Sequence, residues 1–87
     1  MYILNYHRFF FLLQVDVYSF GVLLCEMSIG KLPNPDSREE QVAMVKKHKL
    51  RALIRRCLHQ DPQKRPSMEE IIGELEQFKI GLIGSDP

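Results

Sequence analysis

The most concentrated chemistry in this sequence is a group of cations in its second half. The group consists of Lys46, Lys47, Lys49, Arg51, Arg55 and Arg56. A nucleic-acid site requires such a group on one face, but no Phe, Tyr or Trp lies between these cations and the net charge of the chain is only +1. We therefore favour the alternative interpretation, in which the cations form the solvated face of a helix whose other face is apolar.

The remaining sequence contains no catalytic motif. It has no glycine-rich phosphate loop, no cluster at metal-ligand spacing and no nucleophile with a base near it in sequence. Cys25 and Cys57 are far apart at apolar helical positions, so we interpret both as reduced core residues. We place the scattered His7, His48 and His59 at the surface or in loops. The sequence thus assigns no catalytic, cofactor-binding or metal-binding residue.

Size and composition indicate one small globular domain. The 87 residues are 45% hydrophobic and 26% charged. Twelve basic against eleven acidic residues give no global attraction to nucleic acid or to an anionic membrane. No uncharged run approaches the roughly 20 residues of a spanning helix, and the N-terminus lacks the basic start and small-residue cleavage site of a signal peptide. We therefore expect a cytoplasmic protein.

The apolar pattern predicts an all-α protein of four helices. Between Val15 and Ile29 the apolar residues cover most of the helix circumference, which is typical of a helix at the centre of a larger domain. Asp16 is a candidate N-terminal cap, and Gly30 supplies a left-handed stop. Since so short a chain has few elements to cover this helix, we expect part of its apolar surface to be exposed.

The other three helices follow from capping motifs and one apolar stripe. "SREE" at residues 37–40 predicts a capping box and a short helix to about Val45, and "SMEE" at residues 67–70 predicts a second box and a helix to about Phe78. A third helix starts near Lys49. Its apolar stripe consists of Leu50, Leu53, Ile54, Cys57 and Leu58.

Two segments resemble the C-terminal lobe of a eukaryotic protein kinase. "DVYSFGVLLCEM" is similar to the central helix F, and "LIRRCLHQDPQKRPSMEEIIGEL" is similar to helix H, the following loop and helix I. The resemblance marks residues 15–80 as a partial kinase domain, followed by a flexible tail at residues 81–87. It is greatest to the tyrosine-kinase-like serine/threonine group, because tyrosine kinases more often have Trp where Leu58 stands.

The resemblance implies structural roles for Asp16, Ser19, Gly21, Asp61, Arg65 and Pro66. Asp16 matches the aspartate whose carboxylate accepts N–H bonds from the catalytic loop. Arg65 matches the arginine that pairs with the glutamate of the Ala-Pro-Glu motif. Ser19 and Gly21 match positions at which neighbouring backbone comes close. Asp61 and Pro66 belong to the Asp-Pro-x-x-Arg-Pro string.

The resemblance also implies the activity of the whole kinase, which uses ATP and Mg²⁺ to phosphorylate protein hydroxyls. That reaction requires a glycine-rich loop, a Lys–Glu pair, a His-Arg-Asp loop and an Asp-Phe-Gly metal ligand. None of these strings occurs in the 87 residues. We therefore expect this chain alone to bind no ATP or Mg²⁺ and to be inactive. A non-enzymatic helical interaction module is the competing interpretation, with a small nucleic-acid binder third.

Residues 1–14 do not resemble the activation segment that precedes helix F. "FFFLLQ" can be encoded by a pyrimidine tract ending in CAG, as at the 3′ end of an intron, so one interpretation is translated intron. The other is a real helix that covers part of helix F. In either case helix F exposes apolar side chains, each worth about 1.5–3 kcal/mol when buried. We expect a loosely packed chain that self-associates through that surface.

Overall fold

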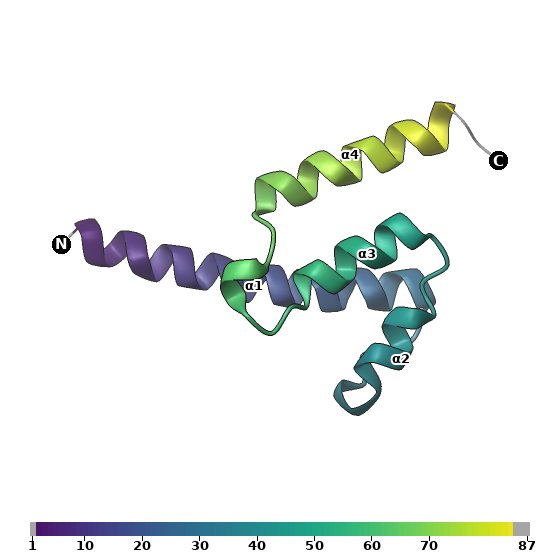
Figure 1. Cartoon of the computed structure of the whole chain (residues 1–87), viewed down its shortest axis with the longest axis horizontal. Coiled ribbons are helices and arrows are strands. Elements are labelled where there is room, and N and C mark those ends of the chain that lie inside the picture. The colour runs from purple at the N-terminus through teal and green to yellow at the C-terminus, as the bar shows by residue number, and fades with distance from the viewer. Residues whose placement is uncertain (1, 85–87) are drawn as a thin grey trace.

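The computed structural model describes residues 2–84, and it describes their side chains from residue 16 to residue 78. Within this part the chain forms four α-helices, two short 3-10 helices and no strand (Figure 1). The elements are α1 (Tyr2–Ile29), η1 (Pro35–Ser37), α2 (Arg38–Ala43), α3 (His48–Cys57), η2 (Pro62–Lys64) and α4 (Met68–Gly84). The prediction of an all-α, four-helix protein is confirmed. No helix of the described part is long and apolar enough to cross a membrane.

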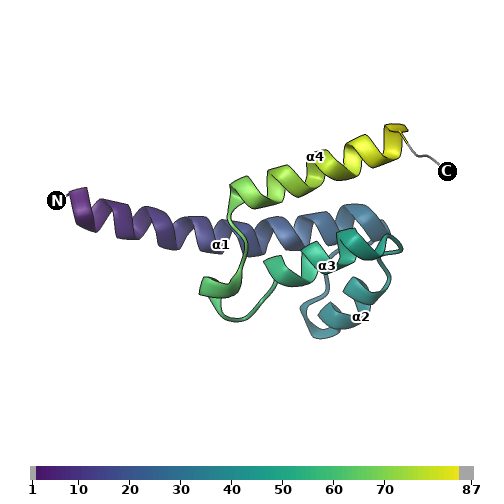
Figure 2. The same cartoon turned by 45° about the horizontal axis from the view of Figure 1, so that its top comes forward.

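Helix α1 is longer than the sequence pattern suggested. It begins at Tyr2 and not at Val15, so the prediction that Asp16 caps its N-terminus is wrong. No glycine or proline occurs between Tyr2 and Phe20, and nothing else in that stretch interrupts the helical backbone. The first half of α1 extends beyond the other helices in both views (Figures 1 and 2).

The predicted stop of this helix is confirmed. Gly30 has a φ of 71°, in the left-handed region that favours glycine. Its N–H donates to the carbonyl oxygen of Glu26 at 2.8 Å, which satisfies one of the last free carbonyls of α1. The chain then turns away from the helix axis and enters the loop before η1.

Helix α3 joins the two parts of the core. One cluster consists of the buried residues Val17, Leu53, Cys57 and Ile71, from α1, α3 and α4. The other consists of Cys25, Val42, Val45 and Ile54, from α1, α3 and the α2 region. The apolar stripe predicted for the third helix supplies the α3 members of both clusters. Its central residues are fully buried and its ends, Leu50 and Leu58, are half-buried.

Only one of the two predicted capping boxes forms. At the start of α4 the Ser67 hydroxyl accepts from the Glu70 N–H at 3.1 Å, and the Glu70 carboxylate accepts from the Ser67 N–H at 3.3 Å. At the start of α2, Ser37 makes no side-chain capping bond. Because the preceding residues already turn as η1, capped by Asn34, Ser37 belongs to the end of one helix and not to an extended entry into the next.

The ends of the second and fourth helices also differ from the prediction. Helix α2 stops at Ala43, two residues before Val45, which is nevertheless buried as expected. Helix α4 continues past Phe78 to Gly84. The last residues of the predicted tail, 85–87, lie outside the described residues.

Candidate functional site

The residues singled out from the sequence fall on two elements that meet in space. Asp16 and Ser19 are exposed on α1. The loop that contains η2 lies against α1 (Figure 1) and carries Asp61, Arg65 and Pro66. We call the surface formed by α1 at residues 16–19 and by the η2 loop the α1–η2 surface.

Arg65 links the two elements of this surface. Its guanidinium carbon lies 4.9 Å from the centroid of the Tyr18 ring, within the range of a cation–π contact. Its Nε donates to the backbone oxygen of His59 at 2.8 Å. The contact joins the η2 loop to α1 at Tyr18, on the stretch of α1 that also carries the exposed Asp16 and Ser19. Sequence reasoning did not single out Tyr18, although it stands between these two residues in the same motif.

The η2 loop is shaped by its own side chains. Asp61 accepts from the Gln63 N–H at 3.0 Å and so caps η2. The Asp61 N–H donates in turn to Nδ1 of His59 at 3.0 Å. Pro66 is buried where the loop leads into α4. These contacts set the path of the loop and thereby the position of Arg65.

Gly21 lies apart from this surface, on the face of α1 that contacts α3. It is buried, and a Cβ atom at this position would lie 2.7 Å from Cβ of Cys57 and 3.2 Å from Cδ2 of Leu58. The absence of a side chain therefore allows α1 and α3 to approach closely. The close neighbours are side-chain atoms of Cys57, the last residue of α3, and of Leu58 directly after it.

The structure also contains a cavity of about 380 Å³ beside the α1–η2 surface, which the sequence pattern did not indicate. Tyr18, Arg38, Arg55 and Gln60 supply polar groups to its wall. Arg55 is paired with Glu39 through contacts of 2.6 and 3.0 Å. The Glu39 carboxylate belongs to the same wall, so the cavity presents both charges, and its lining residues include no Ser, Thr, Cys or His.

The buried cysteines and the described acidic residues do not form a reactive centre. Cys25 and Cys57 are free and buried, which confirms their interpretation as reduced core residues. Burial raises the pKa of the Cys25 thiol, and it raises the pKa of the Cys57 thiol to about 11. Both are therefore poor nucleophiles at neutral pH. Among residues with described side chains, no group of three or more His, Cys, Asp or Glu could hold a metal ion.

One surface ion pair, between α3 and α4, is bidentate. Arg56 donates to both carboxylate oxygens of Glu74, at 3.0 and 2.6 Å, and so joins α3 to α4. The hydrogen bond from Arg56 lowers the pKa of Glu74. This ion pair thus helps to hold α3 and α4 in position relative to one another.

Comparison with known proteins relates this geometry to one family. A profile of the protein tyrosine and serine/threonine kinases matches residues 3–75. A "probable serine/threonine-protein kinase" of Dictyostelium discoideum is 39% identical over 78 residues, which are 75% of this chain and 8% of the relative. The dual specificity protein kinase pyk3 of the same organism is 35% identical over 83 residues, 80% of this chain and 6% of the relative.

A plant relative shows the same pattern of coverage. The serine/threonine/tyrosine-protein kinase HT1 of Arabidopsis thaliana is 33% identical over 78 residues, 75% of this chain and 20% of the relative. The chain thus spans a fifth or less of the length of these three relatives. No solved structure gave a significant match. The family match begins at residue 3, inside the segment for which a translated intron was considered, and the origin of residues 1–14 stays a prediction.

Proposed function

The chain belongs to the protein tyrosine and serine/threonine kinase family and is part of a protein kinase domain, and on this premise we propose that it forms the helical base of a domain that phosphorylates proteins. In this proposal the whole kinase transfers the γ-phosphate of ATP, with Mg²⁺, to protein hydroxyls. The four helices described here position that machinery and do not take part in the chemistry.

The main observation behind this proposal is that residues from two separate sequence motifs are in contact on the α1–η2 surface. Arg65 comes from the Asp-Pro-x-x-Arg-Pro string and Tyr18 from the Asp-Val-Tyr-Ser string, and the two lie in contact although they are far apart along the chain. Asp16 and Ser19, which stand in the same string as Tyr18, are exposed. We propose that the Asp16 carboxylate accepts hydrogen bonds from backbone N–H groups of another segment of the kinase domain, and that the Arg65 guanidinium pairs with a carboxylate of that domain.

The exposed apolar residues of α1 support the same role. Val17 and Cys25 are buried by α3 and its neighbours, whereas Leu23 is 48% exposed on a turn between them. Burial of a leucine side chain of this kind stabilises a fold by about 1.5–3 kcal/mol. In the proposed kinase domain other segments cover this part of α1. In the isolated chain the same surface is available for self-association.

ATP, Mg²⁺ and protein substrates are assigned to the whole kinase and not to this segment. Phosphoryl transfer depends on positioned phosphate-binding and metal-binding groups, and the strings that supply them in this family are missing from the 87 residues. Relatives named as serine/threonine, dual specificity and serine/threonine/tyrosine kinases lead us to propose serine and threonine hydroxyls as acceptors, with tyrosine as a further acceptor. Because the reaction consumes ATP, we propose a cytoplasmic location for the domain.

Two measurements test the proposal together. Isothermal titration of the purified 87-residue chain with ATP and Mg²⁺ is expected to show no binding. Sequencing of the transcript across the codons for Gln14 and Val15 is expected to join Val15 to codons for an activation segment that ends in Ala-Pro-Glu. The protein encoded by that longer transcript should phosphorylate a general substrate such as casein.

The opposite results have distinct meanings. If the transcript starts at Met1 and is translated, the assignment to a catalytic kinase is wrong, and the chain is a non-catalytic helical interaction module. If the longer protein binds ATP but transfers no phosphate, the proposal that these helices position the rest of the kinase domain is retained, and the proposed phosphorylation of proteins is wrong.

A further inference from the structure

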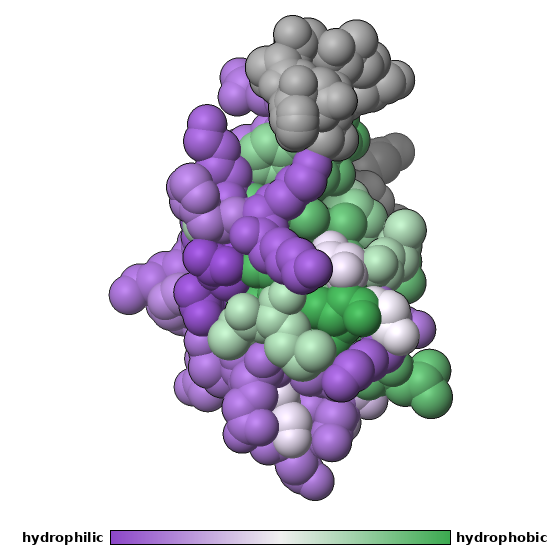
Figure 3. All heavy atoms as spheres, turned by 90° about the vertical axis from the view of Figure 1, so that its right-hand side faces the viewer, coloured by the Kyte–Doolittle hydropathy of each residue, from purple (hydrophilic) through white to green (hydrophobic). Residues whose placement is uncertain are grey.

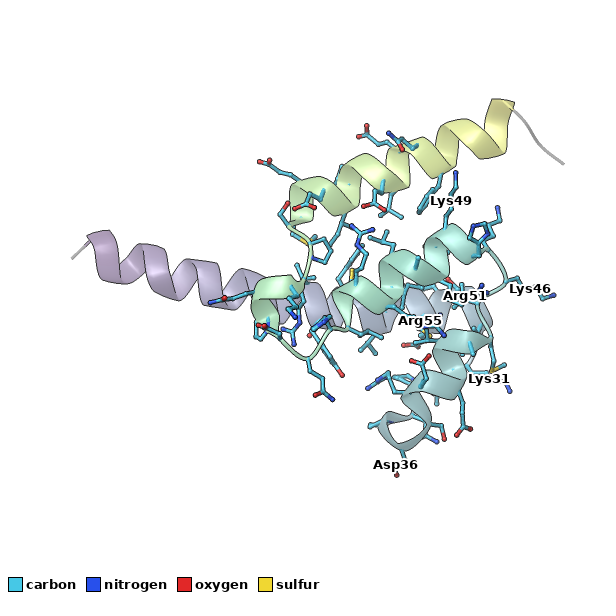
Figure 4. All side chains as sticks on the ribbon, in the orientation of Figure 1. Lys31, Asp36, Lys46, Lys49, Arg51 and Arg55 are labelled. Atoms are coloured by element: carbon cyan, nitrogen blue, oxygen red, sulfur yellow. The ribbon has the colours of Figure 1, made fainter. Side chains whose placement is uncertain are left out.

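Lysine side chains are concentrated at one end of the molecule, although the net charge of the chain is only +1. Figure 4 shows Lys31, Lys46 and Lys49 projecting at the end where α1 finishes and α3 begins. Residues 44–56 contain six cations and no acidic residue. We define the basic end as Lys31, Lys46, Lys47 and Lys49.

The lysines of the basic end differ from the nearby arginines in their contacts. Arg55 is paired with Glu39 and Arg56 with Glu74, each at 2.6 Å. Arg51 donates to the backbone oxygen of Val45 at 2.7 Å. In contrast, all four lysines are exposed, and none of them forms an ion pair or side-chain hydrogen bond within the described part of the chain. The basic end therefore presents four uncompensated charges to solvent.

Exposed apolar side chains lie among these charges. Leu32 follows Lys31 directly and is 80% exposed, Met27 lies one helical turn before Lys31 and is 70% exposed, and Met44 precedes Lys46 by two residues and is 44% exposed. Figure 3 views the molecule from this end and shows hydrophobic side chains between hydrophilic ones.

A buried glutamine determines the position of Leu32. Gln41 is buried, and its Nε2 donates to the backbone oxygen of Leu32 at 2.9 Å. Its Oε1 accepts from the Asn34 N–H at 3.0 Å. The loop that presents Leu32 is thus bound to α2 on both sides of Pro33, which places an apolar side chain in solvent on an ordered backbone.

From these observations we infer that the basic end binds an anionic membrane surface. The lysine ammonium groups lie against lipid phosphates and carboxylates, and Leu32 with Met27 enters the boundary between headgroups and acyl chains. Lysines act as point charges and suit a diffuse negative surface, whereas recognition of a single phosphopeptide favours bidentate arginines, which here are bound to other groups. Single-stranded nucleic acid requires aromatic stacking, and the basic end offers none. The inference concerns location and does not depend on the proposed kinase activity.

Co-sedimentation of the full 87-residue chain with lipid vesicles tests the inference. Vesicles of phosphatidylcholine with about one third phosphatidylserine are compared with pure phosphatidylcholine at low and high salt. We expect binding only to the anionic vesicles, weakened by salt. Lys46→Gln should lower the partition coefficient about fivefold, since one lysine near such a surface is worth about 1 kcal/mol. The matched control is Lys64→Gln, an exposed lysine on η2 away from the basic end, which should bind like the unmodified chain.

A second variant separates the contribution of the apolar side chains to vesicle binding from that of the lysines. Leu32→Ser changes a side chain that is already in solvent, so the fold is retained, and it should weaken vesicle binding without altering the dependence on salt. Equal binding to both kinds of vesicle, or an equal loss in Lys46→Gln and Lys64→Gln, would overturn the inference. Complete competition by soluble polyglutamate would overturn it in favour of an acidic polypeptide partner.

Discussion

Replacement of Gly21 by alanine is the most direct test of the packing between α1 and α3. A Cβ at residue 21 would lie 2.7 Å from Cβ of Cys57, whereas carbon atoms in contact are separated by about 3.5–4.0 Å. Because Cβ of Cys57 is bonded directly to the α3 backbone, no side-chain rotation relieves the overlap. The two helices must therefore move apart by about 1 Å.

The expected magnitude follows from two opposing contributions. Overpacking of a closely packed contact destabilises a protein by about 1–3 kcal/mol. Alanine in place of glycine inside a helix stabilises it by about 1 kcal/mol. Gly21→Ala should thus lower the free energy of unfolding by up to about 2 kcal/mol.

Gly73 provides a matched control on α4. A Cβ at residue 73 would meet no atom within 4 Å, so Gly73→Ala retains only the gain in helix propensity, about 1 kcal/mol. The difference between the two variants isolates the packing contribution of about 1–3 kcal/mol. With a urea dependence of about 1 kcal/mol per molar, their unfolding midpoints should differ by about 1–3 M.

The assay is urea unfolding followed by circular dichroism at 222 nm. We expect the midpoint of Gly21→Ala below that of the unmodified chain and the midpoint of Gly73→Ala above it. If both variants shift the midpoint upward by the same amount, α1 and α3 are not in contact in solution. The loosely packed chain expected from the sequence would then describe the isolated protein.

Three further perturbations address self-association and titration. Leu23→Glu on the exposed part of α1 should raise the monomer fraction in sedimentation velocity more than Ile72→Glu on α4; equal effects would place self-association elsewhere. Burial raises the pKa of Cys57 from 9.0 to about 11 in the fold. The contribution of this thiol to the free energy of unfolding is therefore present below pH 9 and lost as the pH rises to 11. The free energy of unfolding of Cys57→Ala should accordingly change less between pH 9 and pH 11 than that of the unmodified chain. Glu74→Gln should remove at most about 1 kcal/mol at pH 7, because its pair with Arg56 is partly exposed. The lowered pKa of Glu74 means that the unmodified chain loses the same contribution as the pH falls below 4.5 through the folded pKa; an identical acid response in Glu74→Gln and the control Glu76→Gln would contradict this.

Local features of the structure were predictable where neighbouring residues decide them. The stripe of α3 and the left-handed Gly30 depend on residues within about two turns, and both were predicted. The capping box at residues 67–70 formed, while the same motif at residues 37–40 did not. The difference lies in the backbone before each motif. At residues 37–40 the preceding residues are already turned as the 3-10 helix η1.

The sequence by itself determined the helical class, the apolar faces and the kinase family. Only the tertiary structure decided that Arg65 lies over Tyr18, that Gly21 contacts Cys57, and that lysines without partners share one end of the molecule. The physical reason is the range of the interactions. Helical periodicity and turns are set by residues three or four positions apart, whereas these contacts join residues from different helices and loops, and their distances depend on how close the helix axes approach.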